Sequence, residues 1–330
     1  MTSLVLLTLT LSSLLTLGSP WSFTDLYSPF FEVCDSRWIP CDLDKFQTLF
    51  DQQLFGQPLV KNLVVAAISG HFKGDSKKAL VLSFHGWPGV GKNFVSSLLI
   101  KSIFKEGSKS SFYKHYNARV DFTVESRVPV YREKLRAEII ASLLKCERAV
   151  FVFDEVDMMP AKLIDVLYPF IDYQENVSGV DPRKATFIFL SNKGGLDIAD
   201  ITFALWKKSR DRNSYRAFEF AEVLKKTAYN EEGGLQYCDN INSHLISYYV
   251  PFLPLQVEHV TQCIEAELQL RSFFGFTETI VKEVLNQVPF TKKDSPSGGL
   301  FAVSGCKNID TLVSTALEDG YHFKGSDKEL

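Results

Sequence analysis

Three short apolar runs dominate the pattern of hydrophobic and polar positions along the chain. They occupy residues 79–84, 149–153 and 186–190 and are almost uniformly apolar, as in strands buried on both faces. Apolar residues at helical spacing predict helices between these runs, for instance at 93–104 and 131–145. Strands that alternate with helices predict an α/β fold with a doubly wound parallel sheet.

The same pattern divides the chain into four parts. Beyond Pro251 and Pro254 the strong strand signals cease, and helices are expected at 257–271 and 277–288. We therefore expect a large α/β domain followed by a smaller C-terminal α-helical domain. The predicted parts are a signal peptide at 1–18, an irregular N-terminal segment at 19–50, the large domain at 51–251 and the helical domain at 252–330.

The two ends of the chain carry targeting signals. The apolar run Leu4–Leu17 spans roughly 21 Å as a helix, which is too short for a bilayer and typical of a secretory signal peptide. No Lys or Arg precedes it, so a buried N-terminal helix is the alternative. The last four residues, Asp327–Leu330, resemble the Lys-Asp-Glu-Leu retrieval signal with two positions swapped, and a chance charged tail is the alternative. The aromatic segment 21–31 touches a membrane surface peripherally or packs on the domain.

Composition narrows the class of protein. The 330 residues carry 36 basic and 39 acidic side chains, and 45% are hydrophobic. These fractions of charged and hydrophobic residues are typical of globular proteins. The net charge of −3 argues against a broad basic surface that would bind nucleic acid. Six cysteines are too few for a disulfide scaffold in a chain of this length.

The turn after the first predicted strand has the G-x-x-x-x-G-K spacing of a phosphate-binding P-loop. Its glycines let backbone N–H groups surround phosphate oxygens, and the following helix directs the positive end of its dipole at them. An ordinary glycine-rich turn is the alternative. The predicted nucleotide-binding residues are Gly86, Trp87, Pro88, Gly89, Val90, Gly91, Lys92 and Asn93.

Polar residues follow the other two predicted strands. Asp154 would hold Mg²⁺ and Glu155 would orient and deprotonate the attacking water. Asn93 replaces the usual Ser or Thr, and its carbonyl oxygen is a workable ligand for a hard cation, or binds phosphate or water instead. Asn192 would position the water, although an Asn that only forms a turn is the alternative. ATP and Mg²⁺ are thus the expected cofactors.

These motifs together resemble the AAA+ ATPases, and within them the torsin family. The resemblance covers roughly residues 43–315. The stretches that carry it are Leu54–Gln57, Phe84–Val95, Phe151–Asp157, Phe187–Asn192, Val250–Leu255 and Gly305–Lys307.

The resemblance implies an ATPase of the endoplasmic reticulum and nuclear envelope lumen that is nearly inactive alone. A membrane-anchored activator of the lamina-associated-polypeptide type, with a luminal AAA-like domain, would supply an arginine finger. It further implies that Lys307 contacts the γ-phosphate and that Cys263 pairs with Cys306, which makes the nucleotide response redox-sensitive. A homo- or hetero-oligomer and a protein client are implied as well.

Other residues bear on the secretory pathway. Cys34 and Cys41 are close enough in sequence to form a disulfide, and Cys146 and Cys238 would be free thiols. Asn176 begins an N-glycosylation sequon in a polar loop. The basic cluster at 207–212 is the nearest candidate for an arginine finger, but a solvated charged segment is the preferred interpretation.

Three functions remain open from the sequence. The first is a partner-activated ATPase that remodels proteins or membrane assemblies in a chaperone-like way. The second is a nucleotide-dependent assembly scaffold with little hydrolysis, although the intact pair Asp154 and Glu155 argues against it. The third is a cytosolic Clp-like chaperone ATPase, which requires that residues 1–18 be retained.

Overall fold

The computed structural model describes residues 31–230, 234–235, 245–273, 277–292 and 298–326. The predicted signal peptide, Cys238 and the C-terminal tetrapeptide lie outside the described residues. Within the described part of the chain, no helix is long and apolar enough to cross a membrane.

The core of the large domain is a five-stranded sheet in the order β2-β3-β4-β1-β5, and all its neighbouring strands run parallel. The predicted fold class is confirmed, and the three predicted strands form its centre. The two edge strands were not predicted. The strands are β1 (Leu80–His85), β2 (Tyr113–Asn117), β3 (Val150–Asp154), β4 (Thr186–Ser191) and β5 (Tyr248–Pro251).

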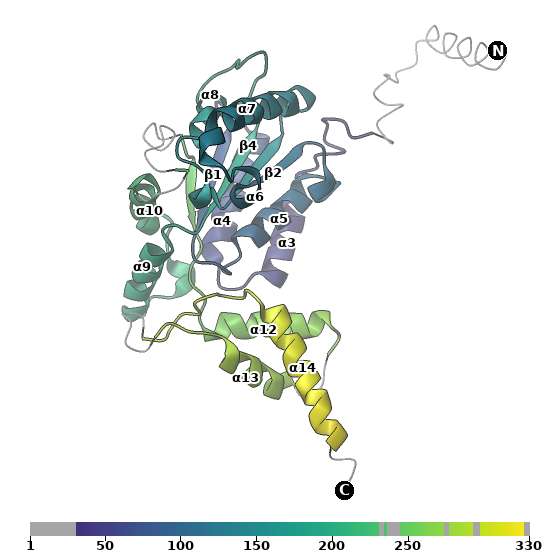
Figure 1. The fold of residues 1–330 in the computed structure, drawn as a ribbon, viewed down its shortest axis with the longest axis vertical. Helices are drawn as coiled ribbons and strands as arrows, with labels where there is room; N and C mark the ends of the chain where they lie inside the picture. Colours follow the sequence, from purple (N-terminus) through teal and green to yellow (C-terminus); the bar gives the residue numbers. More distant parts are fainter. Residues whose placement is uncertain (1–30, 231–233, 236–244, 274–276, 293–297, 327–330) are drawn as a thin grey trace, which may run out of the picture.

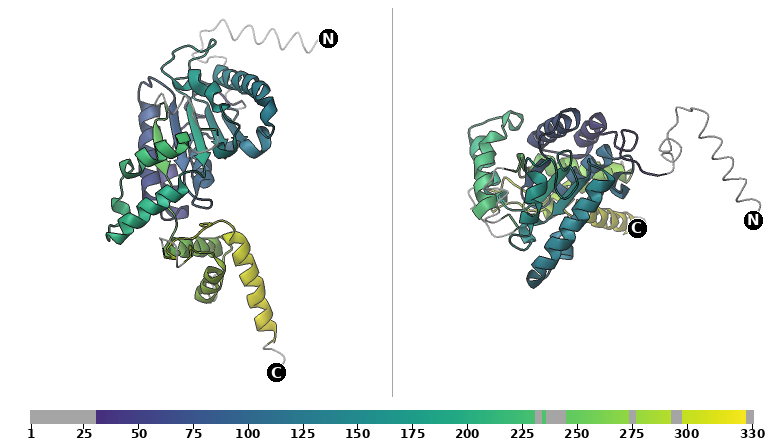
Figure 2. Two further views of the ribbon diagram at one scale, coloured as in Figure 1. Left: turned by 60° about the vertical axis from the view of Figure 1, so that its left-hand side comes forward. Right: turned by 90° about the horizontal axis from the view of Figure 1, so that it is seen from above.

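Helices cover both faces of this sheet. On one face, α3 (Leu43–Gln53), α4 (Pro58–Lys73) and α5 (Lys92–Ile103) pack against Leu82 and its even-numbered neighbours on the strands. On the other face, α7 (Val128–Lys145) packs against odd-numbered strand residues. Figure 2 shows that helices lie on both sides of the sheet. Because successive strand residues point to opposite faces, an unbroken apolar run is needed to fill both layers.

The remaining helices extend this core in two directions. The pair α9 (Gly195–Lys207) and α10 (Phe218–Asn230) packs beside β5, and the short α6 (Ala118–Asp121) and α8 (Tyr168–Ile171) follow β2 and β3. Three further helices pack on one another beyond the carboxyl edge of the sheet, below it in Figure 1. They are α12 (Val257–Leu270), α13 (Thr277–Gln287) and α14 (Ile309–Ser326). The predicted domain boundary near residue 252 lies between β5 and α12 and stays a prediction.

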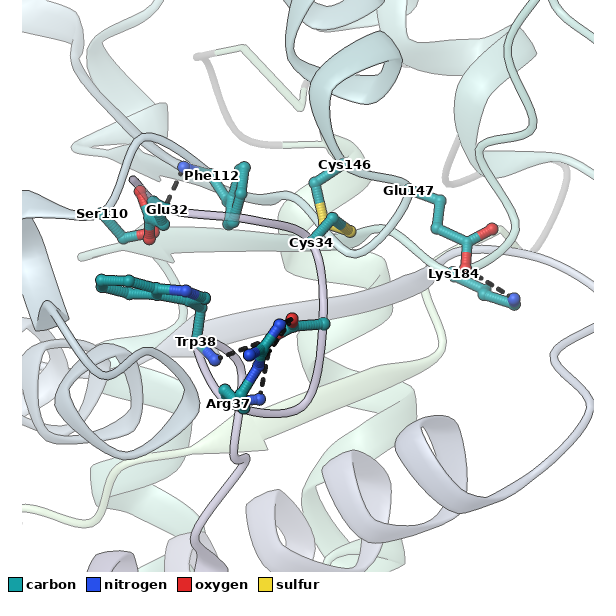
Figure 3. The surroundings of a disulfide bond; sticks show 10 residues. Glu32, Cys34, Arg37, Trp38, Ser110, Phe112, Cys146, Glu147 and Lys184 are labelled. Atoms are coloured by element: carbon teal, nitrogen blue, oxygen red, sulfur yellow. Dashed lines mark hydrogen bonds and ion pairs between the residues drawn. A yellow bond between two sulfur atoms is a disulfide. The ribbon is translucent and has the colours of Figure 1, made fainter. Parts of the chain in front are cut away.

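The N-terminal disulfide differs from the expected one. Cys34 is bonded to Cys146 across a sequence separation of 112 residues (Figure 3). Cys41 is a free thiol. The segment that contains Cys34 passes the C-terminal end of α7, where Cys146 is the cap residue. Meanwhile the Cys41 N–H donates to Ile103 O at the end of α5. The pairing of Cys34 with Cys41 was wrong because nearness in sequence does not place two side chains together.

Candidate functional site

The carboxyl ends of β1, β3 and β4 meet at one edge of the sheet, beside a cavity of about 590 Å³. We call two groups of residues around it the sheet side and the helical side. The sheet side consists of the P-loop 86–93 with Asp154, Glu155 and Asn192. The helical side consists of Leu255, Cys263, Cys306 and Lys307. Gly86 and Trp87 are the members of the sheet side that do not line the cavity.

The P-loop connects β1 to α5, as expected for a phosphate-binding turn. Gly91 is the N-cap residue of α5 and has a φ of +104°, a backbone conformation that favours glycine. A side chain at this position would also meet Leu54, whose Cδ1 would lie 2.5 Å from an added Cβ. The loop therefore brings the first N–H groups of α5 to the cavity, where they are suited to an anion.

Lys92 is buried, and all three of its ammonium donors have acceptors. Nζ donates to Gly86 O at 2.7 Å, to Trp87 O at 2.8 Å and to Asn192 Oδ1 at 2.9 Å. Burial lowers the pKa of Lys92 to about 8, against the opposing effect of the carboxylates of Asp157 and Asp154. A phosphate that reaches Lys92 would replace these protein acceptors and restore a full counter-charge.

Asp154 ends β3 with its carboxylate buried at the sheet edge. Its Oδ2 accepts Asn93 Nδ2 at 2.7 Å and Asn117 Nδ2 at 3.4 Å, and its Oδ1 accepts the Glu155 N–H at 2.9 Å. The structure thus brings the two predicted metal ligands, Asp154 and Asn93, into direct contact. Two amide donors partly offset the negative charge of the carboxylate.

Glu155 has a φ of +53°, which is unusual for a residue with a side chain and turns the chain sharply after β3. Its Oε2 lies 2.5 Å from Arg119 Nε, and Arg119 also lines the cavity. Sequence reasoning missed this contact, because Arg119 lies 36 positions away on α6 and belongs to no motif. In this conformation the predicted base is held in an ion pair.

Asn192 lies where the sequence predicted, directly after β4, and contacts Lys92. Its backbone N–H donates to Asp157 Oδ1 at 3.1 Å. The Asp157 carboxylate thereby ties the segment after β3 to the segment after β4. Sequence reasoning missed this role because the contact joins two loops.

The helical side meets the P-loop backbone directly. Cys263 on α12 is bonded to Cys306, as the family resemblance implied, and the Cys306 N–H donates to Gly89 O at 3.0 Å. The approach is so close that a Cβ on Gly89 would lie 1.8 Å from Ser304 O. Lys307 is exposed and lines the same cavity as Lys92.

A buried side-chain amide also links the P-loop to the segment that follows β5. Gln57 Nε2 donates to Val90 O at 3.1 Å in the P-loop and to Leu253 O at 2.8 Å, and its Oε1 accepts the Leu253 N–H at 2.8 Å. Gln57 had been noted only as part of a motif, without a role. A buried side chain that satisfies three backbone groups fixes the P-loop relative to the segment that leads to α12.

The other predicted residues lie away from the cavity. Asn176 is exposed in the loop before β4, Cys34 forms the N-terminal disulfide with Cys146, and Cys41 is a free thiol. The basic cluster at 207–212 supplies no finger at this site. Arg212 donates to Gly56 O and Pro254 O, with burial lowering its pKa to about 10, and Arg210 pairs with Glu219.

Comparison with known proteins gives the family. The sequence model of the Torsin family matches residues 28–153. A Torsin-like protein of Drosophila melanogaster is 37% identical over 297 residues, which cover 88% of this chain and 86% of that protein. The Torsin-like protein of Caenorhabditis elegans is 38% identical over 297 residues, covering 89% and 83%. The chain belongs to the torsin family. This torsin is therefore an AAA+ ATPase by family.

Among solved structures, the Hsp104-ADP complex of Saccharomyces cerevisiae resembles this torsin with a TM-score of 0.58 at 13% identity. The match covers 87% of this chain and 49% of that chain, so this torsin spans about half the length of that structure. At this identity the likeness shows the fold, which is the α/β P-loop AAA+ fold with a helical C-terminal region.

The residues at the sheet edge fit a magnesium ion. Mg²⁺ prefers oxygen ligands and is usually held by one or two protein groups together with substrate phosphates. Asp154 offers carboxylate oxygens, and Asn93 offers its Oδ1 once the amide turns from Asp154. No group of three or more His, Cys, Asp or Glu residues that could hold a metal ion occurs in the described ranges.

Proposed function

We propose that this torsin is an Mg²⁺-dependent ATPase of the endoplasmic reticulum and nuclear envelope lumen that remodels proteins or membrane assemblies. It hydrolyses ATP slowly alone and is activated by a membrane-anchored partner whose luminal AAA-like domain supplies an arginine. It works as a homo- or hetero-oligomer on a protein client. The observation that carries the proposal is the single cavity shared by Lys92, Asp154, Glu155 and Asn192.

Each of these side chains has a task that its position supports. Lys92 and the N–H groups of the P-loop bind the phosphates, and Lys307 approaches the γ-phosphate from the helical side. Asp154 and Asn93 hold Mg²⁺, which offsets charge on the phosphates. Glu155, after leaving Arg119, takes a proton from the water that Asn192 orients.

The charges at the site support dependence on a partner. Arg119 is the one arginine among the described residues that line the cavity, and it is paired with Glu155. While Arg119 stays paired with Glu155, no arginine of the described cavity lining is directed at the γ-phosphate. An arginine supplied by another chain accelerates hydrolysis by roughly 10³–10⁵-fold in related phosphoryl transfers, so the absence of one predicts slow turnover.

The luminal location is supported by chemistry as well as by the apolar run at 4–17. Disulfides persist in oxidising compartments, and the described residues form two, Cys34–Cys146 and Cys263–Cys306. Asn176 is exposed and begins a sequon, so passage through the lumen would make it an acceptor for a glycan. A mobility shift on glycosidase treatment, lost in Asn176→Gln, is the expected result in protein from the secretory pathway.

The function is tested with Glu155→Gln, which keeps the size of the side chain but removes the base. We expect the variant to bind ATP like wild type, to hydrolyse it at least about 100-fold more slowly with activator present, and to retain the activator. ATP binding is measured by calorimetry, hydrolysis by phosphate release and partner retention by pull-down. Equal single-turnover rates for the variant and wild type would favour the assembly scaffold instead.

A further inference from the structure

His85 is a fully buried imidazole that the functions above do not use. It is the last residue of β1, directly before the P-loop, and its side chain does not line the cavity. Its Nε2 lies 2.7 Å from Ser83 Oγ, and its Nδ1 lies 3.1 Å from Lys193 O. Both ring nitrogens therefore have partners in the protein interior.

The partners fix which nitrogen carries the proton. A carbonyl oxygen only accepts, so Nδ1 carries the hydrogen and donates it to Lys193 O. Nε2 is then the acceptor, and the Ser83 hydroxyl donates to it. Burial lowers the pKa of His85 to about 4, so the ring stays neutral and this arrangement persists at neutral pH.

The carbonyl that His85 binds belongs to the turn that carries Asn192. Other contacts hold the same turn: the Asn192 N–H donates to Asp157 Oδ1 at 3.1 Å, and the Lys193 N–H donates to Ser191 Oγ at 3.1 Å. The first comes from the segment after β3 and the second from within the turn. His85 supplies the contact from β1, the strand that leads into the P-loop.

The turn has little freedom to find another position. Gly194 has a φ of +75°, and an added Cβ would lie 2.6 Å from Leu224 Cδ2. At the other end of the turn, the Asn192 side chain accepts Lys92 Nζ at 2.9 Å. His85 therefore connects the start of the P-loop to the turn whose Asn192 contacts the P-loop lysine.

We infer that His85 is a positioning residue for hydrolysis: its Nδ1–H holds Lys193 O and thereby keeps the Asn192 side chain beside Lys92 and the γ-phosphate. This inference rests on the proposed function, in which Asn192 orients the attacking water. Any buried imidazole needs partners for its ring nitrogens, and what distinguishes His85 is that one of these partners, Lys193 O, belongs to the turn that carries Asn192.

Two substitutions separate positioning from simple packing. In His85→Asn, the amide Nδ2 lies as far from the backbone as His Nδ1 does and can still donate to Lys193 O. In His85→Gln, the amide nitrogen corresponds to His Nε2, so it faces Ser83 and leaves Lys193 O without this donor. The pair matches in chemical group and differs in which neighbour the group reaches.

We expect His85→Gln to slow single-turnover hydrolysis about tenfold, with the Kd for ATP changed less than about threefold, and His85→Asn to stay within about threefold of wild type in both. Ser83→Ala removes the hydroxyl that donates to His85 Nε2, so the tautomer of His85 is no longer fixed from that side. Its rate of single-turnover hydrolysis should lie between those of the two His85 variants. Hydrolysis is followed with protein in excess over labelled ATP, in the presence and absence of activator. Equal rates for the Asn and Gln variants would overturn the inference.

A second measurement decides the matter without turnover. Hydrogen exchange of the peptide that contains residues 191–195 should be at least about fivefold faster in His85→Gln than in His85→Asn or wild type. Unchanged exchange in a folded His85→Gln would overturn the positioning role. If wild type fails to hydrolyse ATP with activator, the proposed function is wrong. The hydrogen-exchange result still decides whether His85 holds the turn that carries Asn192.

A double variant tests whether the effect passes through Asn192. If it does, adding His85→Gln to Asn192→Ala should slow hydrolysis by less than about twofold more than Asn192→Ala alone. Additive losses would show that His85 acts on another part of the site and would overturn this assignment. Chemical denaturation of all variants gives their stabilities, so a loss of fold is recognised separately.

Discussion

The two sides of the nucleotide cavity are built in different ways. On the sheet side, functional groups follow buried strands and are held by buried hydrogen bonds, as Lys92 and Asp154 are. On the helical side, Lys307 is exposed on a loop, and the Cys263–Cys306 disulfide joins that loop to α12. The two sides meet through backbone, at Gly89 and Cys306.

This difference suggests a division of labour. A group fixed by several buried contacts is preorganised, and catalysis by positioning needs such groups. A group on an exposed loop responds more readily to a ligand, a partner or a change in the disulfide. We therefore expect changes on the sheet side to remove binding or chemistry, and changes on the helical side to adjust affinity.

The largest effect is expected from Lys92→Ala. The substitution removes a buried ammonium and the charge that faces the phosphates, and contacts of this kind contribute about 1.5–3 kcal/mol each. Nucleotide affinity should fall by at least about 100-fold, because tenfold corresponds to 1.4 kcal/mol. Calorimetric titration with ATP measures it, with Lys307→Ala as the matched change on the helical side. A greater loss for Lys307→Ala would reverse the comparison.

The second prediction concerns the pH dependence of binding through the same lysine. The pKa of Lys92 is lowered to about 8, so the free protein loses this positive charge as the pH rises through that value. Binding of phosphate must then restore a proton, and ATP affinity should decline by up to about tenfold per pH unit above 8. Affinity measured from pH 7 to about 9.5 tests this, and the decline should disappear in Lys92→Arg because a guanidinium stays charged.

The central part of the fold and much of the sheet side could be predicted because their signals are local. An unbroken apolar run predicts a strand buried on both faces, and a polar residue at its end indicates the carboxyl edge of the sheet. The edge strand at 113–117 was missed because its sequence, Tyr-Lys-His-Tyr-Asn, is mostly polar. The apolar spacing at 161–172 predicts one helix, but the structure has two short turns there, η4 (Ile164–Leu167) and α8, with Pro169 near their junction.

Contacts between distant segments could not be predicted from the sequence. The partner of Cys34 lies 112 residues away, and nothing local distinguishes Cys146 from another cysteine. Arg119 and Asp157 act through loops that meet only after the sheet has formed. The Cys263–Cys306 pairing was available beforehand through family resemblance alone.

The third prediction breaks the contact between the two sides. Gly89→Ala adds a Cβ that would lie 1.8 Å from Ser304 O, so the loop that carries Cys306 and Lys307 must move away. Gly179→Ala is a matched control, since Gly179 also has a positive φ, of +88°, but nothing lies within 4 Å of an added Cβ. Both should lose about 1 kcal/mol or more of unfolding free energy from backbone strain. Only Gly89→Ala should lose ATP affinity as well, by about fivefold.

The smallest effect on binding is expected from the disulfides, and it separates the two sides most cleanly. Replacing Cys263 and Cys306 by serine frees the helical side, so ATP affinity should change by about threefold. Replacing Cys34 and Cys146 opens the larger loop, of 112 rather than 43 residues, but this bond lies away from the cavity.

Chain entropy gives both changes a cost in unfolding free energy of about 4–5 kcal/mol, slightly more for the larger loop. Loss of Cys34–Cys146 should therefore cost more unfolding free energy, as measured by denaturation. Loss of Cys263–Cys306 should change ATP affinity more, as measured by calorimetric titration. If the Cys34–Cys146 pair altered ATP affinity as much as Cys263–Cys306, the nucleotide response would reflect general loosening of the chain. If only Cys263–Cys306 alters it, the helical side is the part of this torsin that translates thiol oxidation into nucleotide affinity.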